Sequence, residues 1–116
     1  MKDDKLYLIH IAECIARIEQ YTQGGSAAFM GSTLIQDAVL RNLQTMAQSV
    51  RNLSEDMKAQ HPEIDWRGII GFRNVLVHDY LAVDMERTWD IVDHDLPDLK
   101  HKIEAILGAM ENRSSL

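Results

Sequence analysis

The feature that most constrains this chain is a long apolar repeat near its middle. Its members recur every three or four residues: Ile35, Val39, Leu43, Met46, Val50, Leu53 and Met57. This spacing matches the 3.6-residue turn of an α-helix and places the apolar side chains on one face. A bundle helix is favoured over a coiled coil because the run is short. The repeat predicts one long core helix that Pro62 stops, since the residue before a proline disfavours the α region.

The rest of the chain predicts further helices of the same kind. An earlier apolar stripe ends before Gly24-Gly25-Ser26, and consists of Leu8, Ile11, Ile15 and Ile18. Asp65 is the expected cap of a helix that begins at Trp66 and presents Ile69, Phe72 and Leu76. We therefore expect an all-α protein, organised as a single helical domain over residues 1–116.

Two more helices are predicted after this point. Asp84 suits the cap of a short helix containing Trp89 and Val92. Pro97 suits the first turn of a last helix, whose stripe is Leu99, Ile103, Ile106 and Met110. The expected architecture is a four- to five-helix bundle.

Composition narrows the class of protein. The single cysteine, Cys14, excludes an intrachain disulfide and is expected to be a buried, inert thiol in a reducing compartment. No segment approaches the roughly 20 apolar residues of a membrane span, and no signal peptide is recognisable, so a cytoplasmic protein is expected. The net charge of −6 argues against nucleic-acid binding through bulk charge, so any such contact needs a local patch.

Residues 73–80, RNVLVHDY, crowd ionisable groups around a short apolar run. On an ideal helix Arg73 and Tyr80 share a face, whereas Arg73 and His78 diverge by roughly 140°. Two copies related by a two-fold axis would bring both arginines and both histidines into one cleft, which predicts a homodimer. Arginine can hold a phosphate and histidine can transfer a proton, so the pair could cleave RNA without a metal. The spacing alone, however, is also compatible with purely structural side chains near a helix end.

A wider set of features resembles the HepT-like toxins of the HEPN superfamily, from Leu34 to Leu107. The matching features are the segments 37–41 (DAVLR), 62–66 (PEIDW) and 70–74 (IGFRN), the Arg-x4-His-x-Tyr signature, Val83-Asp84, Trp89 and Leu96-Pro97. The resemblance implies that Arg73 and His78 are a ribonuclease pair in a dimer cleft, with RNA as the substrate. It also implies a partner nucleotidyltransferase of the MntA type, which would silence the toxin by attaching AMP to Tyr80. No metal ion or cofactor is expected.

One part of the chain departs from the family pattern. The family commonly has Gly-Glu-Ala in the long helix, where this chain has Ala47-Gln48-Ser49. If the usual glutamate orients the catalytic arginine, Gln48 can still accept a hydrogen bond but supplies no charge, so activity would be weakened. The alternative is that the family's glutamate is only structural. Asn74 is a second candidate supporting residue, for the imidazole or for a phosphate.

Three functions remain open from the sequence. The leading hypothesis is an endoribonuclease toxin, and the alternative is a non-catalytic nucleotide-binding module that scaffolds or activates the nucleotidyltransferase. A structural bundle without a site is the third. Arg41 and Arg67 could extend a basic patch, while His94, between two aspartates, is expected to belong to a solvated acidic cluster rather than to a metal site.

Overall fold

The computed structural model describes the backbone of residues 2–77 and 84–114 and the side chains of residues 3–72 and 84–112. All regular structure in these residues is helical, which confirms the all-α prediction. The longest helices are α1 (Lys2–Tyr21), α3 (Thr33–Asn52), α5 (Trp66–Val77) and α7 (Leu96–Ser114). Shorter segments connect them: α2 (Gly25–Met30), α4 (Glu55–Gln60), α6 (Met85–Asp90) and a π-helical turn, η1 (Ile91–Asp95). The predicted count of four or five helices is therefore not confirmed.

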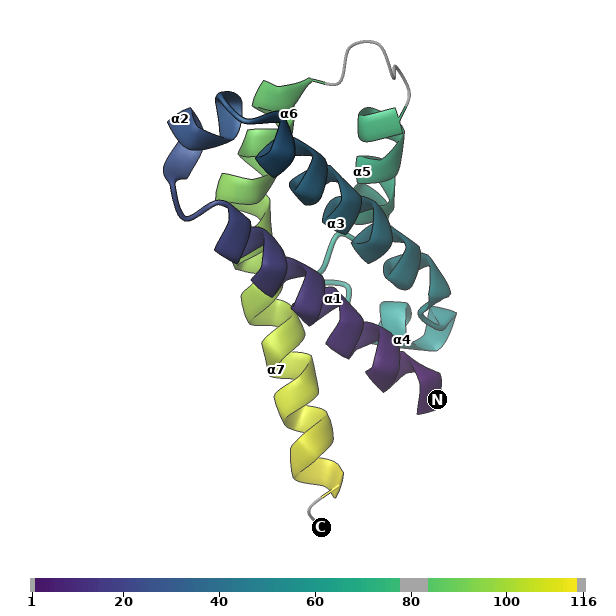
Figure 1. Ribbon diagram of the computed structural model, residues 1–116. Coiled ribbons are helices and arrows are strands. Elements are labelled where there is room, and N and C mark those ends of the chain that lie inside the picture. The colour runs from purple at the N-terminus through teal and green to yellow at the C-terminus, as the bar shows by residue number, and fades with distance from the viewer. Residues whose placement is uncertain (1, 78–83, 115–116) are drawn as a thin grey trace.

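The core lies between α1, α3 and the rod formed by α6, η1 and α7 (Figure 1). The predicted stripe of α1 is buried at every position, because α1 packs against both α3 and α7. On α3, Leu43, Met46 and Val50 have no exposed surface. No helix in the described part of the chain is long and apolar enough to cross a membrane.

The turn after α1 introduces a helix that the sequence did not predict. Gly25 adopts a φ of 83°, a left-handed conformation that favours glycine. The short helix α2 follows and buries Phe29, whose ring lies 5.3 Å from that of Trp89 on α6. Residues 20–36 carry no charged side chain, so no acidic residue marks the start of this helix in the sequence.

The prediction of one continuous helix from residue 35 to residue 57 is wrong. The chain leaves α3 at Leu53, whose φ of −63° and ψ of 145° are extended, and re-enters a helix at Glu55. Ser54 caps α4 by accepting a hydrogen bond from the Met57 amide at 3.1 Å. Asp4 of α1 accepts hydrogen bonds from the Ser54 amide and hydroxyl, at 2.8 and 2.7 Å.

These hydrogen bonds favour the ionised form of the Asp4 carboxyl group. Burial alone would raise the pKa of its carboxyl group, whereas the two hydrogen bonds from Ser54 and the charge of the N-terminal amino group lower it. The pKa of Asp4 therefore lies below its ordinary value of 3.8. A buried carboxylate of α1 thus stabilises the break between α3 and α4, fifty residues later in the sequence.

The last two predicted helices are present but are not separated by a loop. Asp84 caps α6 as expected, accepting from the Arg87 amide at 3.0 Å. The rod then continues through η1, where the Leu96 amide donates to the Ile91 carbonyl. Val92, predicted in the short helix, lies in this π-helical turn. Pro97 lies in the first turn of α7, as predicted.

Candidate active site

The helix that carries the signature residues begins at a tightly built corner. Asp65 accepts a hydrogen bond from the Gly68 amide at 3.0 Å, which confirms it as the cap of α5. A Cβ atom at Gly68 would press on the carboxylate group of Asp65, so a larger residue here would require that side chain to shift. The Trp66 indole N–H donates to the carbonyl groups of Lys58 and His61, at 3.1 Å each. These contacts fix the start of α5 against the end of α4.

Arg73 and Asn74 lie on α5, which packs against α3 and ends at Val77. The side chains of Arg73 and Asn74 lie outside the described residues, and so do His78 and Tyr80 entirely. The helical-face relationships predicted for His78 and Tyr80 therefore remain predictions. Just before Arg73, Ile69 and Phe72 are 5% and 8% exposed, which confirms the predicted apolar face of α5 up to that point.

Gln48 lies on the exposed face of α3, whereas its two neighbours are buried. Its side-chain amide donates to the Asn52 side chain at 3.4 Å, one helical turn away. Ala47 has no exposed surface and Ser49 is 5% exposed. Of the three residues that replace Gly-Glu-Ala, Gln48 therefore lies at a solvent-facing position, whereas Ala47 and Ser49 lie in the interior.

Ser49 belongs to a polar cluster between α1 and α3 that the sequence did not reveal. Its hydroxyl lies 2.5 Å from Nδ1 of His10 on α1, and the other ring nitrogen of His10 lies 3.8 Å from the Cys14 thiol. Cys14 also contacts the Thr45 hydroxyl at 4.0 Å. Burial raises the pKa of the Cys14 thiol, as expected for an inert cysteine. Because Cys14 and Ser49 are buried, this cluster joins the helices rather than presenting a nucleophile.

A groove of about 690 Å³ lies beside the same stretch of α5. One wall is formed by α5 up to Phe72, the residue before Arg73, and the other by η1 and α7. His94 and Asp95 line it, with Lys102 paired to Asp98 at 2.9 Å. Among the residues that the structure describes, no group of three or more potential ligand side chains could hold a metal ion. His94 is exposed and has Asp93 as its neighbour at 3.8 Å.

The two tryptophans contribute to packing. Trp66 is 8% exposed, and Trp89 is half-buried against Phe29. His61 lies 3.1 Å from the Glu63 carboxylate. Among the described residues, these side chains do not form a second candidate site near α5.

Comparison with known proteins decides the family. A family model for HepT-like ribonucleases matches residues 11–106, which include every residue from α3 to the start of α7 and the whole signature. This chain belongs to the HepT-like ribonuclease family. The resemblance inferred from the sequence is thereby confirmed.

Individual relatives of this HepT-like chain carry ribonuclease names. It is 37% identical over 106 residues to the "Probable ribonuclease HepT" of Thermococcus cleftensis, covering 90% of this chain and 96% of that protein. It is 25% identical over 120 residues to the "mRNA nuclease HepT" of Shewanella oneidensis, covering 83% of this chain and 90% of that protein.

A longer relative shows that this domain also occurs within a larger protein. The chain is 33% identical over 115 residues to a Methanocaldococcus jannaschii protein named "Gamma-glutamylcyclotransferase and putative RNase". The match covers 98% of this HepT-like chain but 52% of that relative, so the chain spans about half its length. No solved structure matches the chain.

Proposed function

We propose that this HepT-like protein is a metal-independent endoribonuclease toxin that works as a homodimer. The observation that carries the proposal is the family match over residues 11–106, because that range contains Arg73, the four intervening residues and His78. The name of the Shewanella oneidensis relative, an mRNA nuclease, supports RNA as the substrate class.

The proposed chemistry uses the neighbouring ribose as the nucleophile. His78 removes the proton from a ribose 2′-hydroxyl, and the oxygen attacks the adjacent phosphorus. A 2′-O–P bond forms while the P–O5′ bond breaks, and the departing 5′-oxygen takes a proton from water. The products are a 2′,3′-cyclic phosphate and a 5′-hydroxyl end. Arg73 stabilises the added negative charge of the transition state through its planar fork, and Asn74 supports the imidazole or the phosphate.

The test is cleavage of RNA by purified protein in excess chelator. We expect the wild type to cut, and Arg73→Ala and His78→Ala to lose about 10²–10⁴ in rate. Arg73→Lys should also fail, because lysine keeps the charge but loses the bidentate geometry. Arg17→Ala, which removes an exposed arginine of α1, is the matched control. Wild-type rates in a folded Arg73 or His78 variant would refute the assignment.

The dimer is proposed because a single helix would not bring Arg73 and His78 together. Mixing the inactive Arg73→Ala and His78→Ala chains tests this, since heterodimers would contain one intact site if each site draws on both subunits. Recovered cleavage supports a shared site. Heterodimers that form without any recovery would place each site within one chain.

Tyr80 is proposed as the point of control by a partner nucleotidyltransferase. A phenol with an ordinary pKa near 10 is a poor base beside histidine, so Tyr80 is not needed for the chemistry. AMP attached there would place an anionic phosphate near Arg73, where it would compete with RNA. Tyr80→Phe should keep most of the cleavage activity but resist silencing by the partner with ATP, and mass spectrometry should find the AMP adduct on the wild type alone.

Gln48 favours a second candidate function, a non-catalytic nucleotide-binding module that scaffolds the nucleotidyltransferase. The position is exposed and lacks the carboxylate that the family commonly carries there. The variant Gln48→Glu separates the two functions. If the wild type does not cleave RNA but Gln48→Glu does, the chain has lost its catalytic activity and the second function is supported. Cleavage by the wild type supports the enzyme.

A further inference from the structure

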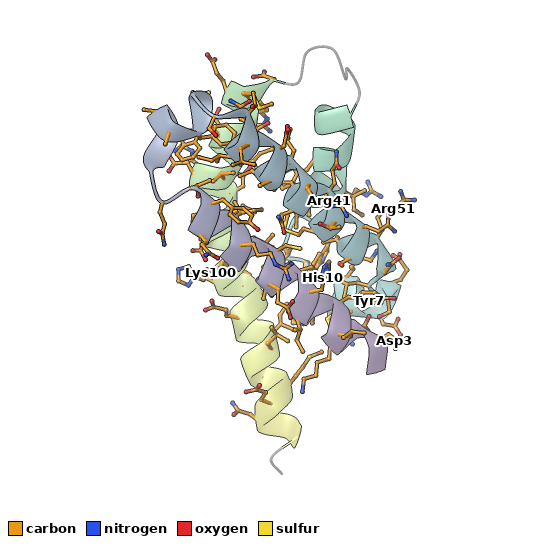
Figure 2. All side chains as sticks on the ribbon, viewed as in Figure 1. Asp3, Tyr7, His10, Arg41, Arg51 and Lys100 are labelled. Atoms are coloured by element: carbon orange, nitrogen blue, oxygen red, sulfur yellow. The ribbon has the colours of Figure 1, made fainter. Side chains whose placement is uncertain are left out.

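The outward side of α3 carries a row of long polar side chains, here named the outer stripe. It consists of Arg41, Gln44, Gln48 and Arg51, all exposed and spaced three or four residues apart. The opposite side of the same helix is buried in the core. Residues with this spacing form one continuous track along a helix, and Figure 2 labels the two arginines along α3.

The charge of the outer stripe is opposite to that of the whole chain. The net charge is −6, yet residues 38–54 contain no aspartate or glutamate. Asp37, one turn before Arg41, is the nearest acid on this face of α3, and within the described residues it forms no ion pair with Arg41. Neither arginine has a carboxylate partner there, so both guanidinium groups are free to bind an anion from solution.

Four other cations of the described chain lie within 4 Å of a carboxylate: Arg17 with Glu13 at 3.6 Å, Lys58 with Glu55 at 3.2 Å, Lys100 with Glu19 at 3.1 Å and Lys102 with Asp98 at 2.9 Å. These pairs are on α1, α4 and α7. Lys5, Arg67 and Arg87 form no ion pair with a described carboxylate, but each lies on a different helix. Arg41 and Arg51 differ from these three because they share one face of one helix with no acid between them, so α3 offers the local patch that an acidic protein needs to bind a polyanion.

The geometry of the outer stripe suits a sugar–phosphate backbone. Ten residues of helix place Arg41 and Arg51 about 15 Å apart along the axis, a span of a few nucleotides. Guanidinium forks bind phosphate oxygens in a planar, bidentate manner. Gln44 and Gln48 lie between them with amide groups that can donate to phosphate or ribose oxygens.

We propose that the outer stripe binds the backbone of single-stranded RNA and guides it toward Arg73 on the adjoining helix α5. This proposal rests on the proposed function for its substrate class. Contacts to phosphates carry no sequence information, so the stripe contributes affinity and positioning and leaves base preference to other residues. Such binding weakens predictably as salt rises, because each phosphate contact releases condensed counterions.

The experiment measures the salt dependence of RNA affinity by fluorescence anisotropy. The probe is a labelled 2′-O-methyl oligouridine, which lacks the 2′-hydroxyl and so is not cleaved by attack of that group. The slope of log affinity against log salt should fall by about 0.7 for Arg41→Gln, by about 0.7 for Arg51→Gln, and by about twice that for the double variant. Arg17→Gln, an exposed arginine with a carboxylate partner on α1, should keep the wild-type slope.

Two results would overturn the proposal. One is a folded double variant with the wild-type slope, and the other is an equal fall in Arg17→Gln, which would show an effect of bulk charge. Light scattering refines the first result. If the double variant keeps the wild-type slope but no longer self-associates, the outer stripe is a protein interface and the proposal is rejected. Thermal unfolding confirms that each variant is folded.

The two proposals fail in different ways. If the wild type binds the probe with an arginine-dependent slope but does not cleave ordinary RNA, the proposed enzyme is wrong and the stripe stands. If ordinary RNA is cleaved in chelator but the slope does not depend on Arg41 or Arg51, the stripe is wrong and the enzyme stands. In an active protein, the double variant should raise KM for long RNA and leave kcat unchanged.

Discussion

The junction between α3 and α4 and the junction between α6 and α7 behave in opposite ways. At the first, an apolar repeat continues in phase but the helix breaks at Leu53. At the second, a proline predicts a new helix but the preceding helix runs into it through η1. The apolar repeat and the proline therefore did not decide where these helices end.

The physical cause differs at the two junctions. At the break, Asp4 and Ser54 satisfy the amide groups that a continuous helix would have bonded internally. At the continuation, the wider π-helical turn precedes Pro97, whose ring would crowd the carbonyl group four residues earlier in a regular α-helix. A break thus depends on a distant partner, whereas a continuation depends on local backbone geometry.

The largest effect is expected from removing that distant partner. Asp4→Ala should lower the free energy of unfolding by about 1.5–3 kcal/mol at neutral pH, since it removes hydrogen bonds to a buried carboxylate. Chemical denaturation measures this, and hydrogen exchange should show lost protection of the Ser54 amide. Asp3→Ala, an exposed acid in the same turn, is the control. Equal losses in both variants would mean that Asp4 acts through general charge rather than through Ser54.

The contribution of Asp4 should also depend on pH. Because the folded-state pKa lies below the ordinary value of 3.8, the stabilisation is fully present well above pH 3.8. It is lost as pH falls below 3.8 and through the lower folded-state pKa. The difference in unfolding free energy between wild type and Asp4→Ala should shrink over that range, and a constant difference would contradict the assignment.

A smaller effect is expected from the cap itself. Ser54→Ala should cost about 1 kcal/mol, because it removes the acceptor of the Met57 amide while the Ser54 backbone amide can still bond to Asp4. The double variant with Asp4→Ala should lose less than the sum of the single losses, since the two side chains share a hydrogen bond. Strict additivity in denaturation experiments would show that the two act separately.

The smallest effect is expected at the continuous junction. Pro97→Ala should change the free energy of unfolding by less than about 1 kcal/mol, because the π-helical turn already accommodates the ring and no distant contact is lost. A loss as large as that of Asp4→Ala would show that Pro97 holds the two helices in place. In that case the contrast between the junctions would not hold.

The sequence predicted the parts of the fold that depend on local signals. The α1 stripe, the Asp65 and Asp84 caps and the helix with Pro97 in its first turn all follow from short patterns and are present. The break at Leu53 was missed because its partner, Asp4, lies fifty residues before Ser54. The helix α2 was missed because it spans only six residues with no charged side chain.

In the candidate site, too, only the features that depend on nearby residues could be predicted from the sequence. The positions of Arg73 and Asn74 on α5 follow from the cap at Asp65, and the family is confirmed. The contact of His10 with Ser49 was not predictable, because it joins two helices through residues that match no catalytic or metal-binding spacing.

The packing of the two tryptophans gives the protein a built-in pair of optical probes. Trp66 reports on the corner between α4 and α5, where its N–H is bonded to two carbonyl groups, and Trp89 reports on the contact of α6 with α2. Replacing either with phenylalanine leaves one emitter, so fluorescence of each single-tryptophan variant follows one region during unfolding. Coincident transitions would identify a single cooperative unit, and separate transitions would show which end of the bundle opens first.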